Sequence, residues 1–266
     1  MSPDRARVPS DQGEAWVVEE APLLIEVGEE RVLTFRTPGH DEELALGFLV
    51  AEGILRRAAD VERIELSPPG EQAAVARARA VLAPGAQLGP VARERLSRAH
   101  AVRPSCGLCG LTSAEGLTRD LPELAPGRPR TSIAALAAME RAMRARQDLF
   151  QATGGCHAAG AFDAASGEVW AVREDVGRHN ALDKALGACL AAGKELSAAA
   201  VVLSGRAGYE LVLKALRLGV PIVASVSAPS RLAVELAAER GQTLVAFLRD
   251  GAGRVFWDEG RLAAPG

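Results

Sequence analysis

The segment from residue 198 to residue 247 alternates between short apolar runs and longer amphipathic runs, and this alternation is the strongest constraint on the fold. Short apolar runs bounded by turn residues are typical of buried strands, whereas apolar residues spaced three and four apart are typical of helices. Strands that alternate with helices over short loops predict a parallel sheet that is covered by helices. We expect strands at residues 198–203, 221–226, 243–247 and 254–257, and helices at residues 178–192, 207–218 and 230–240.

Two further patterns extend this domain toward the N-terminus. Apolar runs at residues 158–162 and 168–172 flank a glycine-containing turn, so they predict a β-hairpin. Ser132 is a favourable N-cap for a long helix that runs to Phe150. Together the patterns predict an α/β domain with three layers and a mixed sheet over residues 131–266.

The first half of the chain predicts a smaller α+β domain over residues 16–130, after a flexible tail at residues 1–15. Asp41 opens an amphipathic helix that ends at Gly53. A change in composition near residue 130, after a run rich in Pro and Gly, marks the expected domain boundary. The expected strands cover residues 23–27, 31–35, 61–66 and 73–82.

Charge and hydropathy exclude some classes of function. The formal net charge of −3 argues against non-specific nucleic-acid binding, which needs a broad basic surface. No apolar run approaches the roughly 18 residues of a membrane-spanning helix, and residues 1–13 lack the apolar region of a signal peptide. We therefore expect a cytoplasmic protein that binds neither nucleic acid nor membrane. In that compartment its four cysteines are expected to be thiols.

Cys106 and Cys109 form a Cys-x-x-Cys motif between glycines, a pattern that serves metal binding, redox exchange or sulfur relay. A tetrahedral metal site needs four ligands. The chain has no second Cys-x-x-Cys, although Cys156 and His157 could complete a zinc site. A thiolate on a glycine-rich loop suits attack on an external sulfur donor. We favour a sulfur-carrying function for this pair.

Polar residues are dense where strand 168–172 meets the following helix. Arg178 and His179 begin that helix, where positive charge opposes the helix dipole, so an anionic ligand is expected there. The alternative is a solvated loop in which Asp183 and Lys184 face water.

Three other loops have the character of phosphate sites. Ser204-Gly205-Arg206 and residues 225–230 each follow an apolar strand and open a helix. Ligands of parallel α/β sheets bind at the carboxyl ends of strands, and helix N-termini favour phosphate. Residues 247–254 form a glycine hairpin with two arginines, whose simpler interpretation is a solvated turn. His157 follows two glycines and is an acid/base, a ligand contact or a core histidine.

These motifs together resemble the FdhD family of formate dehydrogenase accessory proteins, from about residue 20 onward. The matching stretches are residues 43–49 with 52–53, 105–110, 153–159, 173–184, 204–206 and 227–237. The run Arg173 to Asn180 is the most specific of them. Two positions depart from the pattern that the resemblance leads us to expect: Cys156 lies within the Thr-Gly-Gly-x-His motif, and Leu111 replaces a polar or basic residue.

The resemblance implies a sulfurtransferase. A cysteine desulfurase would supply persulfide sulfur, Cys106 would hold it, and Cys109 would assist or relay. The acceptor would be the molybdenum (or tungsten) bis-guanine-dinucleotide cofactor of formate dehydrogenase, bound as substrate and without a permanently bound metal. It also implies a cytidine-deaminase-like fold and a homodimer. With the loops above, the expected cofactor-binding residues are His157, Arg173, Asp175, Arg178, His179, Asn180, Ser204, Gly205, Arg206, Ser227, Phe247, Leu248, Arg249, Asp250, Gly251 and Ala252.

Two alternatives remain at this point: a cofactor chaperone that moves no sulfur, and a structural zinc protein. Deaminase activity is excluded, because a zinc deaminase needs a glutamate two residues after the histidine. Here His157 is followed by Ala158 and Ala159.

Overall fold

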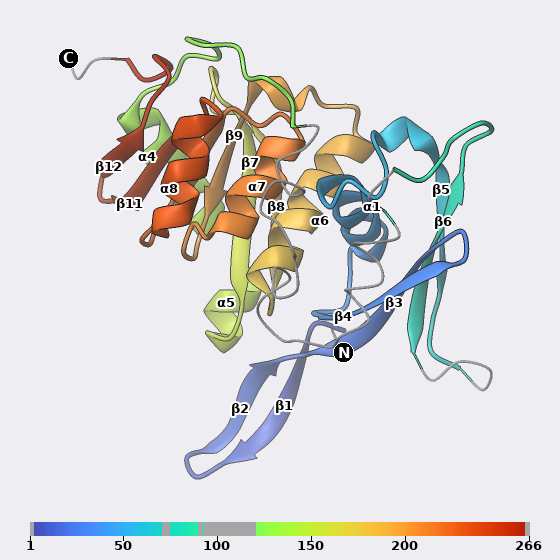
Figure 1. The fold of residues 1–266 in the computed structure, drawn as a ribbon. Coiled ribbons are helices and arrows are strands. Elements are labelled where there is room, and N and C mark those ends of the chain that lie inside the picture. The colour runs from blue at the N-terminus through green and yellow to red at the C-terminus, as the bar shows by residue number, and fades with distance from the viewer. Residues whose placement is uncertain (1–2, 71–74, 90–91, 93–120, 264–266) are drawn as a thin grey trace. The chain divides into compact units, whose positions relative to one another are not determined.

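The computed structural model describes residues 3–70, 75–89, 92 and 121–263 of the 266-residue chain, which fall into two compact units (Figure 1). Of the described residues, the first unit contains those up to 92, 147–157 and 174–191. The second contains 121–146, 158–173 and 192–263. This division differs from the contiguous boundary that the sequence predicts near residue 130. Two later segments belong to the first unit because they pack against its N-terminal part. The helix in residues 174–191 packs against the helix that Asp41 opens, and the helix in residues 147–157 packs against the strand at residues 13–18.

The second unit is built on a six-stranded mixed sheet with the strand order β12-β11-β10-β9-β7-β8. Strands β9, β10 and β11 are parallel, with Val223 aligned to both Val201 and Leu244. Strands β7 and β12 run antiparallel to their neighbours β9 and β11. The strands are β7 (His157–Asp163), β8 (Val169–Asp175), β9 (Ala199–Leu203), β10 (Ile222–Ser225), β11 (Thr243–Arg249) and β12 (Ala252–Trp257); the first residue of β7 and the last two of β8 are counted with the first unit.

Helices cover both faces of this sheet. Helix α4 (Ile133–Arg144) packs its Leu136, Met139 and Met143 side chains against alternate residues of the strands. Helices α7 (Tyr209–Arg217) and α8 (Arg231–Glu239) are the crossovers from β9 to β10 and from β10 to β11. Right-handed crossovers place both on one face, opposite α4. The expected alternation of strands and helices is therefore confirmed, whereas the comparison with cytidine deaminase stays a prediction.

The helix that Ser132 caps is shorter than the sequence predicts. Its cap is confirmed, since the Ser132 hydroxyl accepts a hydrogen bond from the Ala135 N–H at 3.1 Å. The helix ends at Arg144, and the non-helical backbone of Gln147 precedes a separate helix, α5 (Asp148–Thr153), in the first unit.

The first unit has a four-stranded sheet with the order β4-β3-β6-β5. Strands β3 and β6 are parallel, and the buried residues Leu23, Ile25 and Val27 align with buried alanines of β6. Alternation with a period of two thus puts one face of the sheet in the core. The strands are β3 (Ala21–Val27), β4 (Glu30–Arg36), β5 (Val61–Ser67) and β6 (Ala76–Leu82), joined by helix α1 (Asp41–Ala51) and the short helix η1 (Ala58–Asp60).

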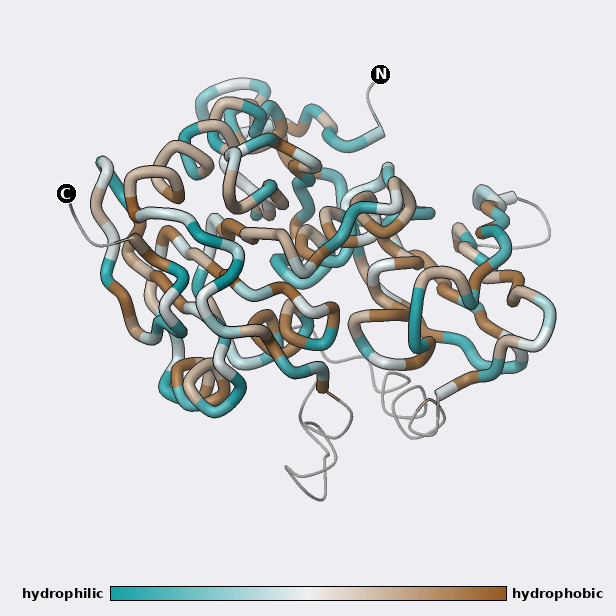
Figure 2. Tube along the Cα trace, turned by 90° about the horizontal axis from the view of Figure 1, so that it is seen from above, coloured by the Kyte–Doolittle hydropathy of each residue, from teal (hydrophilic) through white to brown (hydrophobic). Residues whose placement is uncertain are grey.

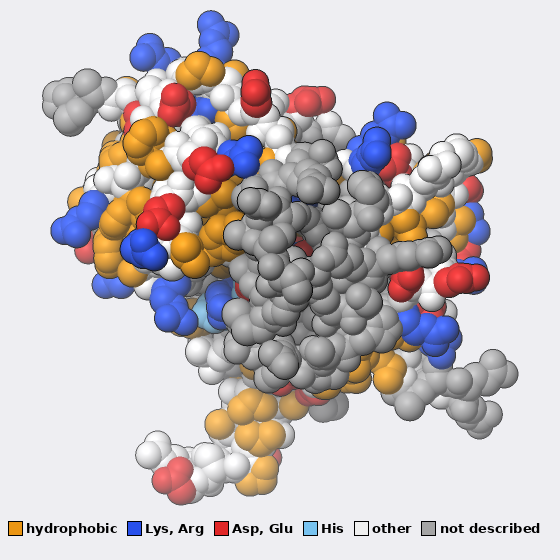
Figure 3. All heavy atoms as spheres, in the orientation of Figure 1, with side chains coloured by type: hydrophobic (Ala, Val, Ile, Leu, Met, Phe, Trp, Pro, Cys, Tyr) orange, Lys and Arg blue, Asp and Glu red, His pale blue; other side chains and the backbone are white. Residues whose placement is uncertain are grey.

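The flexible tail expected at residues 1–15 is wrong. Strands β1 (Arg5–Ser10) and β2 (Gly13–Val18) form an antiparallel hairpin in this region. The turn is closed by the Ser10 hydroxyl, which donates to the Gly13 carbonyl oxygen at 2.6 Å. Val8, Trp16 and Val17 remain exposed, and hydrophobic side chains are visible along the hairpin in Figure 3.

Figure 2 shows hydrophobic residues within the strands and helices of both units and hydrophilic residues at many of the turns. On the visible face of the second unit, basic and acidic side chains are interspersed (Figure 3). None of the helices in the described part of the chain is long and apolar enough to cross a membrane.

Buried Arg261 holds together distant segments of the second unit. Its guanidinium donates to the carbonyl oxygens of Ala125, Arg128 and Gly241 at 2.6, 2.7 and 2.6 Å. Guanidinium groups have several donors in a fixed geometry, so one side chain can hold several carbonyls at once. Residues 125–128 are therefore anchored to the C-terminal part of the same unit.

Helices α1 and α6 (Arg178–Ala191) form the closest helix contact of the first unit. A Cβ atom built on Gly47 would overlap the carbonyl oxygen of Asp183, and one built on Gly187 would overlap that of Glu43. The two glycines thus meet each other's helix backbone, and no larger residue fits without separating the helices.

We predict that Gly47→Ala lowers the free energy of unfolding by about 1–3 kcal/mol, because the new methyl group overlaps a backbone atom that cannot turn aside. Urea unfolding followed by circular dichroism measures the change. Gly70→Ala is the control, since a Cβ there meets no atom within 4 Å; it should change stability by less than about 0.5 kcal/mol. Equal effects of the two substitutions would contradict the crossing as described.

Candidate functional site

The Cys106–Cys109 motif lies outside the described residues. The sulfur-carrying function expected of it stays a prediction. The described candidates fall in both units and are taken unit by unit.

In the second unit the carboxyl ends of β9, β10 and β11 meet at one edge of the sheet. Residues 204–208 follow β9 and residues 226–230 follow β10. Backbone hydrogen bonds join the two loops: the Ala207 N–H donates to the Ala228 carbonyl, and the Ser230 N–H donates to the Ala207 carbonyl. We call residues 204–208, 226–230 and 247–254 the rim. The structure therefore joins these two loops at one edge of the sheet, where the sequence predicts both of them.

Two serines of this edge are used to hold it. The Ser204 hydroxyl accepts from the Ala158 N–H at 2.8 Å, and the Ser225 hydroxyl donates to the Ser227 carbonyl at 2.7 Å. Ser204 and Ser227 are expected ligand residues, and these bonds show that they also position the loops. Strand β7 runs antiparallel to β9, so Ala158 marks the start of β7 at the same edge.

Arginines supply the positive charge of the rim. The guanidinium groups of Arg206 and Arg249 are exposed, and no described residue forms a hydrogen bond or ion pair with either of them. Arg173 is the last residue of β8 that belongs to the second unit. Because β8 follows β7 through a tight hairpin, β8 runs back toward the edge where β7 begins, and Arg173 lies near that edge. Phosphate oxygens are the ligands that such arginines bind most strongly.

The stretch from Phe247 to Ala252 has an irregular backbone. Phe247 has a φ of 54°, which is rare for a residue with a side chain, and the pairing of β11 with β12 shifts between Ala246 and Arg249. Such bulges redirect side chains and are frequent beside binding sites. Asp250 and Gly251, at φ 50° and 84°, form the two-residue turn between Arg249 and Ala252, where positive φ is required. The Phe247 N–H donates to the Ser227 carbonyl oxygen at 3.3 Å, so this stretch belongs to the rim.

The bulge turns Phe247 outward and Leu248 inward. The Phe247 side chain is 42% exposed and lies under the Arg254 guanidinium, 5.6 Å from the ring centre. A shallow depression of about 300 Å³ is lined by Phe247, Ala252, Gly253 and Arg254. Leu248 is fully buried in the core of the second unit, so its side chain cannot contact a ligand. The assignment of Leu248 to the ligand is thus corrected to a core position: within residues 247–252 it is the buried residue, and the other five are exposed.

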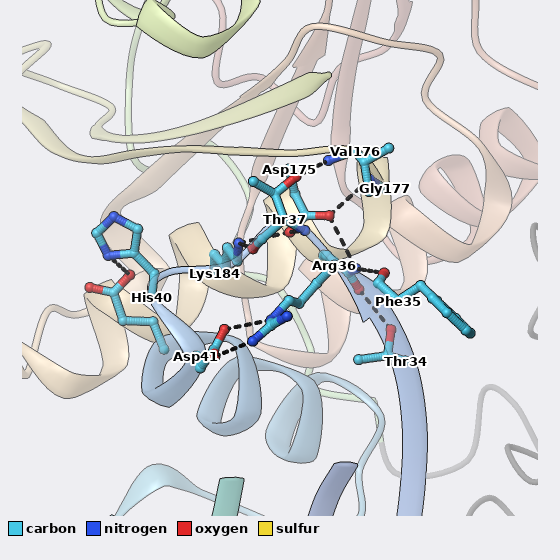
Figure 4. A network of polar contacts seen from close by, with 12 residues as sticks. Thr34, Phe35, Arg36, Thr37, His40, Asp41, Asp175, Val176, Gly177 and Lys184 are labelled. Atoms are coloured by element: carbon cyan, nitrogen blue, oxygen red, sulfur yellow. Dashed lines mark hydrogen bonds and ion pairs between the residues drawn. The ribbon is translucent and has the colours of Figure 1, made fainter. Parts of the chain in front are cut away.

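In the first unit the turn between β8 and α6 is held by a buried polar network (Figure 4). Asp175 is fully buried, and its carboxylate pairs with the Lys184 ammonium at 2.7 Å. It also accepts from the N–H groups of Thr37 and Gly177 at 3.1 and 2.9 Å, and from the Asn180 amide at 3.2 Å. Burial raises the pKa of the Asp175 carboxyl, and the Lys184 ammonium acts in the opposite direction.

This network changes what Asp175 and Asn180 are expected to do. The Asp175 carboxylate is enclosed by protein groups, and the Asn180 amide donates to the Phe35 carbonyl oxygen at 2.7 Å. For Asp175, direct contact with a ligand is replaced by a structural function, which is to shape the turn; the half-buried Asn180 also shapes the turn and stays a predicted ligand contact. Lys184 is buried as well, so the interpretation in which Asp183 and Lys184 face water is wrong.

Arg178 and His179 begin α6 and are half-buried. No described residue forms an ion pair or hydrogen bond with the Arg178 guanidinium, which therefore remains available to an anion. His157, the first residue of β7, is also half-buried. All three stay predicted ligand contacts.

Sequence reasoning missed Thr37 and the function of Lys184. The Thr37 hydroxyl accepts from the Val176 N–H at 3.0 Å, and the Thr37 carbonyl accepts from the Lys184 ammonium at 2.7 Å. The available signal was a lysine at a position of α6 that faces α1, where a charged group needs a buried partner.

Cys156 lies in a protected environment. Its thiol is buried and donates to the Glu174 carboxylate at 3.3 Å. Burial raises the pKa of the Cys156 thiol, and the negative charges of Glu174, Asp175 and Asp4 raise it further. A thiol with a raised pKa is a poor nucleophile and a poor zinc ligand, because both functions need the thiolate. Among the described residues, no three His, Cys, Asp or Glu side chains are grouped to hold a metal ion.

A loop-bearing edge of a parallel sheet with unpartnered arginines is typical of α/β proteins that bind nucleotides or other phosphorylated ligands. The chain belongs to the FdhD/NarQ family, whose sequence model matches residues 18–263.

Relatives agree along nearly the whole length. The sulfur carrier protein FdhD of Mycolicibacterium paratuberculosis is 43% identical over 248 residues, covering 91% of this chain and 90% of that one. FdhD of Anaeromyxobacter dehalogenans is 43% identical over 262 residues, covering 95% and 90%. The crystal structure of a Desulfotalea psychrophila protein, named as a formate dehydrogenase accessory protein, matches with a TM-score of 0.74 at 26% identity over 97% of this chain and 98% of that one.

We predict that Cys156 reacts with iodoacetamide at pH 8 at least about tenfold more slowly in the folded protein than in urea, because its thiolate is suppressed. Since the raised pKa lies above the ordinary value of about 8.5, labelling of the folded protein should keep rising beyond pH 9. Peptide mapping by mass spectrometry measures both effects. Labelling at the same rate in folded and unfolded protein would show that the thiol is not protected.

Proposed function

We propose that this protein is a sulfurtransferase that carries persulfide sulfur from a cysteine desulfurase to the molybdenum (or tungsten) bis-guanine-dinucleotide cofactor required by formate dehydrogenase. The names of the relatives, sulfur carrier and formate dehydrogenase accessory protein, support this class of function. The observation that carries the proposal is the rim, where exposed Arg206 and Arg249 lack a described partner beside an exposed aromatic ring. A guanine dinucleotide offers phosphates and a purine to such a surface.

Sulfur transfer begins at Cys106. Its thiolate attacks the outer sulfur of the desulfurase persulfide; the S–S bond of the donor breaks, a new S–S bond forms on Cys106, and the desulfurase cysteine leaves as a thiolate. Cys109 then attacks the inner sulfur of the Cys106 persulfide. A Cys106–Cys109 disulfide forms, the terminal sulfur leaves as hydrosulfide for the metal of the substrate, and a dithiol reductant restores both thiols.

The rim binds the substrate in this proposal. Arg206 and Arg249 face its phosphates, and Phe247 stacks on a guanine, since aromatic faces bind bases without need of hydrogen bonds. Arg178 and His179 of the first unit are retained as predicted anion contacts. Homodimer formation and a cytoplasmic location are also part of the proposal.

We predict that incubation with an active cysteine desulfurase and cysteine adds the mass of one sulfur atom to the protein, removable by reductant and located on the Cys106–Cys109 peptide. Intact-mass measurement with peptide mapping tests this. Cys106→Ala should abolish the gain and the maturation of formate dehydrogenase, whereas Cys156→Ala, the control, should leave both intact. A wild-type protein that gains no sulfur while still binding guanine nucleotide would instead support the chaperone.

We predict that Arg206→Ala weakens the affinity for GDP by roughly tenfold or more, the effect of losing one charge-assisted hydrogen bond. Isothermal titration calorimetry measures the affinity. Arg141→Ala is the matched control, because Arg141 is an exposed arginine on α4, away from the rim. If GDP binds both variants as tightly as wild type, Arg206 does not belong to the site.

A further inference from the structure

The buried Lys184–Asp175 pair is weak evidence for stability and calls for another explanation. The Lys184 and Asp175 side chains are 1% and 0% exposed, and their charged atoms lie 2.7 Å apart. Removing two charges from water costs as much as or more than their attraction returns, and well-packed apolar residues would serve stability equally well. Such a pair is retained where it fixes a geometry.

The geometry that it fixes is the start of α6. Lys184 and Asp175 bond to the Thr37 carbonyl and N–H, and the Thr37 hydroxyl accepts from the Val176 N–H. The Asp175 carboxylate also accepts from the Gly177 N–H. As Figure 4 shows, Thr37, Asp175, Val176 and Gly177 point toward one another, so these hydrogen bonds restrain the backbone just before Arg178.

We infer that Lys184 and Asp175 are positioning residues for an anion site at the start of α6: they hold the Val176–Gly177 turn so that Arg178 and His179 face a phosphate group of the proposed substrate. The inference rests on the proposed function, which supplies the phosphorylated substrate. Neither residue touches that substrate. Both act through the turn, and the benefit is that the binding groups are ordered before the ligand arrives.

A nearby pair provides a matched control. Arg36 and Asp41 form a bidentate ion pair at 2.9 and 2.7 Å, also largely buried in the first unit. They join β4 to α1, and among the described residues their side chains make no bond to residues 175–180. A general loss of packing in this unit should therefore appear with either pair, whereas a loss of positioning should appear with only one.

The test uses double variants of the full-length protein, because removing one partner would leave an uncompensated buried charge. Asp175→Asn with Lys184→Met is compared with Arg36→Met with Asp41→Asn, and Thr37→Val is a milder third variant that removes only the acceptor of the Val176 N–H. Calorimetry measures the affinities for GDP and for guanosine. Hydrogen exchange followed by NMR measures the protection of the Val176 and Gly177 amides.

We expect the first double variant to lose amide protection at both residues and to bind GDP roughly tenfold or more weakly, with its affinity for guanosine changed less than twofold. The control pair should keep both properties. Thr37→Val should lose protection at Val176. A selective loss of the phosphate contribution is not expected from a purely structural defect, which would weaken both ligands.

The outcomes separate the two ideas. If the wild-type protein does not bind GDP, the proposed function loses its substrate site, while amide exchange still reports on the turn. If the first double variant keeps its amide protection, or keeps its preference for GDP over guanosine, the positioning inference is overturned and the proposed function stands.

Discussion

The first unit depends on how closely α1 and α6 can approach. Gly47 and Gly187 each face the other helix's backbone, so the two helices cross without side chains between them. At this separation the Lys184 ammonium, on α6, reaches the Thr37 carbonyl just before α1. Packing therefore comes first, and the polar network is its consequence. Without the glycines, Lys184 and Asp175 would still attract each other but would no longer meet the backbone that they organise.

The polar groups of the rim divide into those that are used by the fold and those that are not. The Ser204 and Ser225 hydroxyls form hydrogen bonds with backbone groups, as polar groups that are removed from water generally do. The Arg206 and Arg249 guanidiniums stand at the same edge without a described partner, although arginine readily forms bidentate pairs. The positive φ of Phe247 also costs free energy and, unlike that of Asp250 in the two-residue turn between β11 and β12, is not required by a hairpin turn. Binding chemistry is therefore expected from the unpartnered groups and the strained backbone, supported by the satisfied ones.

The elements that the sequence predicts well are those with a periodic core. Strands β9, β10 and β11 and helices α7 and α8 alternate strictly, and their apolar spacing leaves one arrangement. The β1–β2 hairpin could not be predicted in this way, since it has no core face and its Val8, Trp16 and Val17 stay exposed.

The same reasoning explains the errors within the candidate site. A motif shows which residue types are present, whereas burial decides which of them can meet a ligand. Asp175 and Leu248 lie in stretches of binding character but turn inward, one to Lys184 and the other to the core. Only the three-dimensional positions of α1 and of the bulge in β11 reveal this, because both depend on contacts between residues far apart in sequence.

A protein that carries persulfide sulfur must keep that sulfur on the intended cysteine. Thiol–disulfide exchange proceeds through the thiolate, so a competing thiol is harmless only if it stays protonated and enclosed. Cys156 meets both conditions: its neighbours are carboxylates, and its hydrogen is donated to Glu174. Glu174 in turn accepts the N–H groups of Leu149 and Phe150 at the start of α5, so its negative charge is fixed beside the sulfur. Cys189 is enclosed on α6. Burial and neighbouring carboxylates that would disable a catalytic cysteine thus make Cys156 compatible with the proposed sulfur carrier, and burial encloses Cys189.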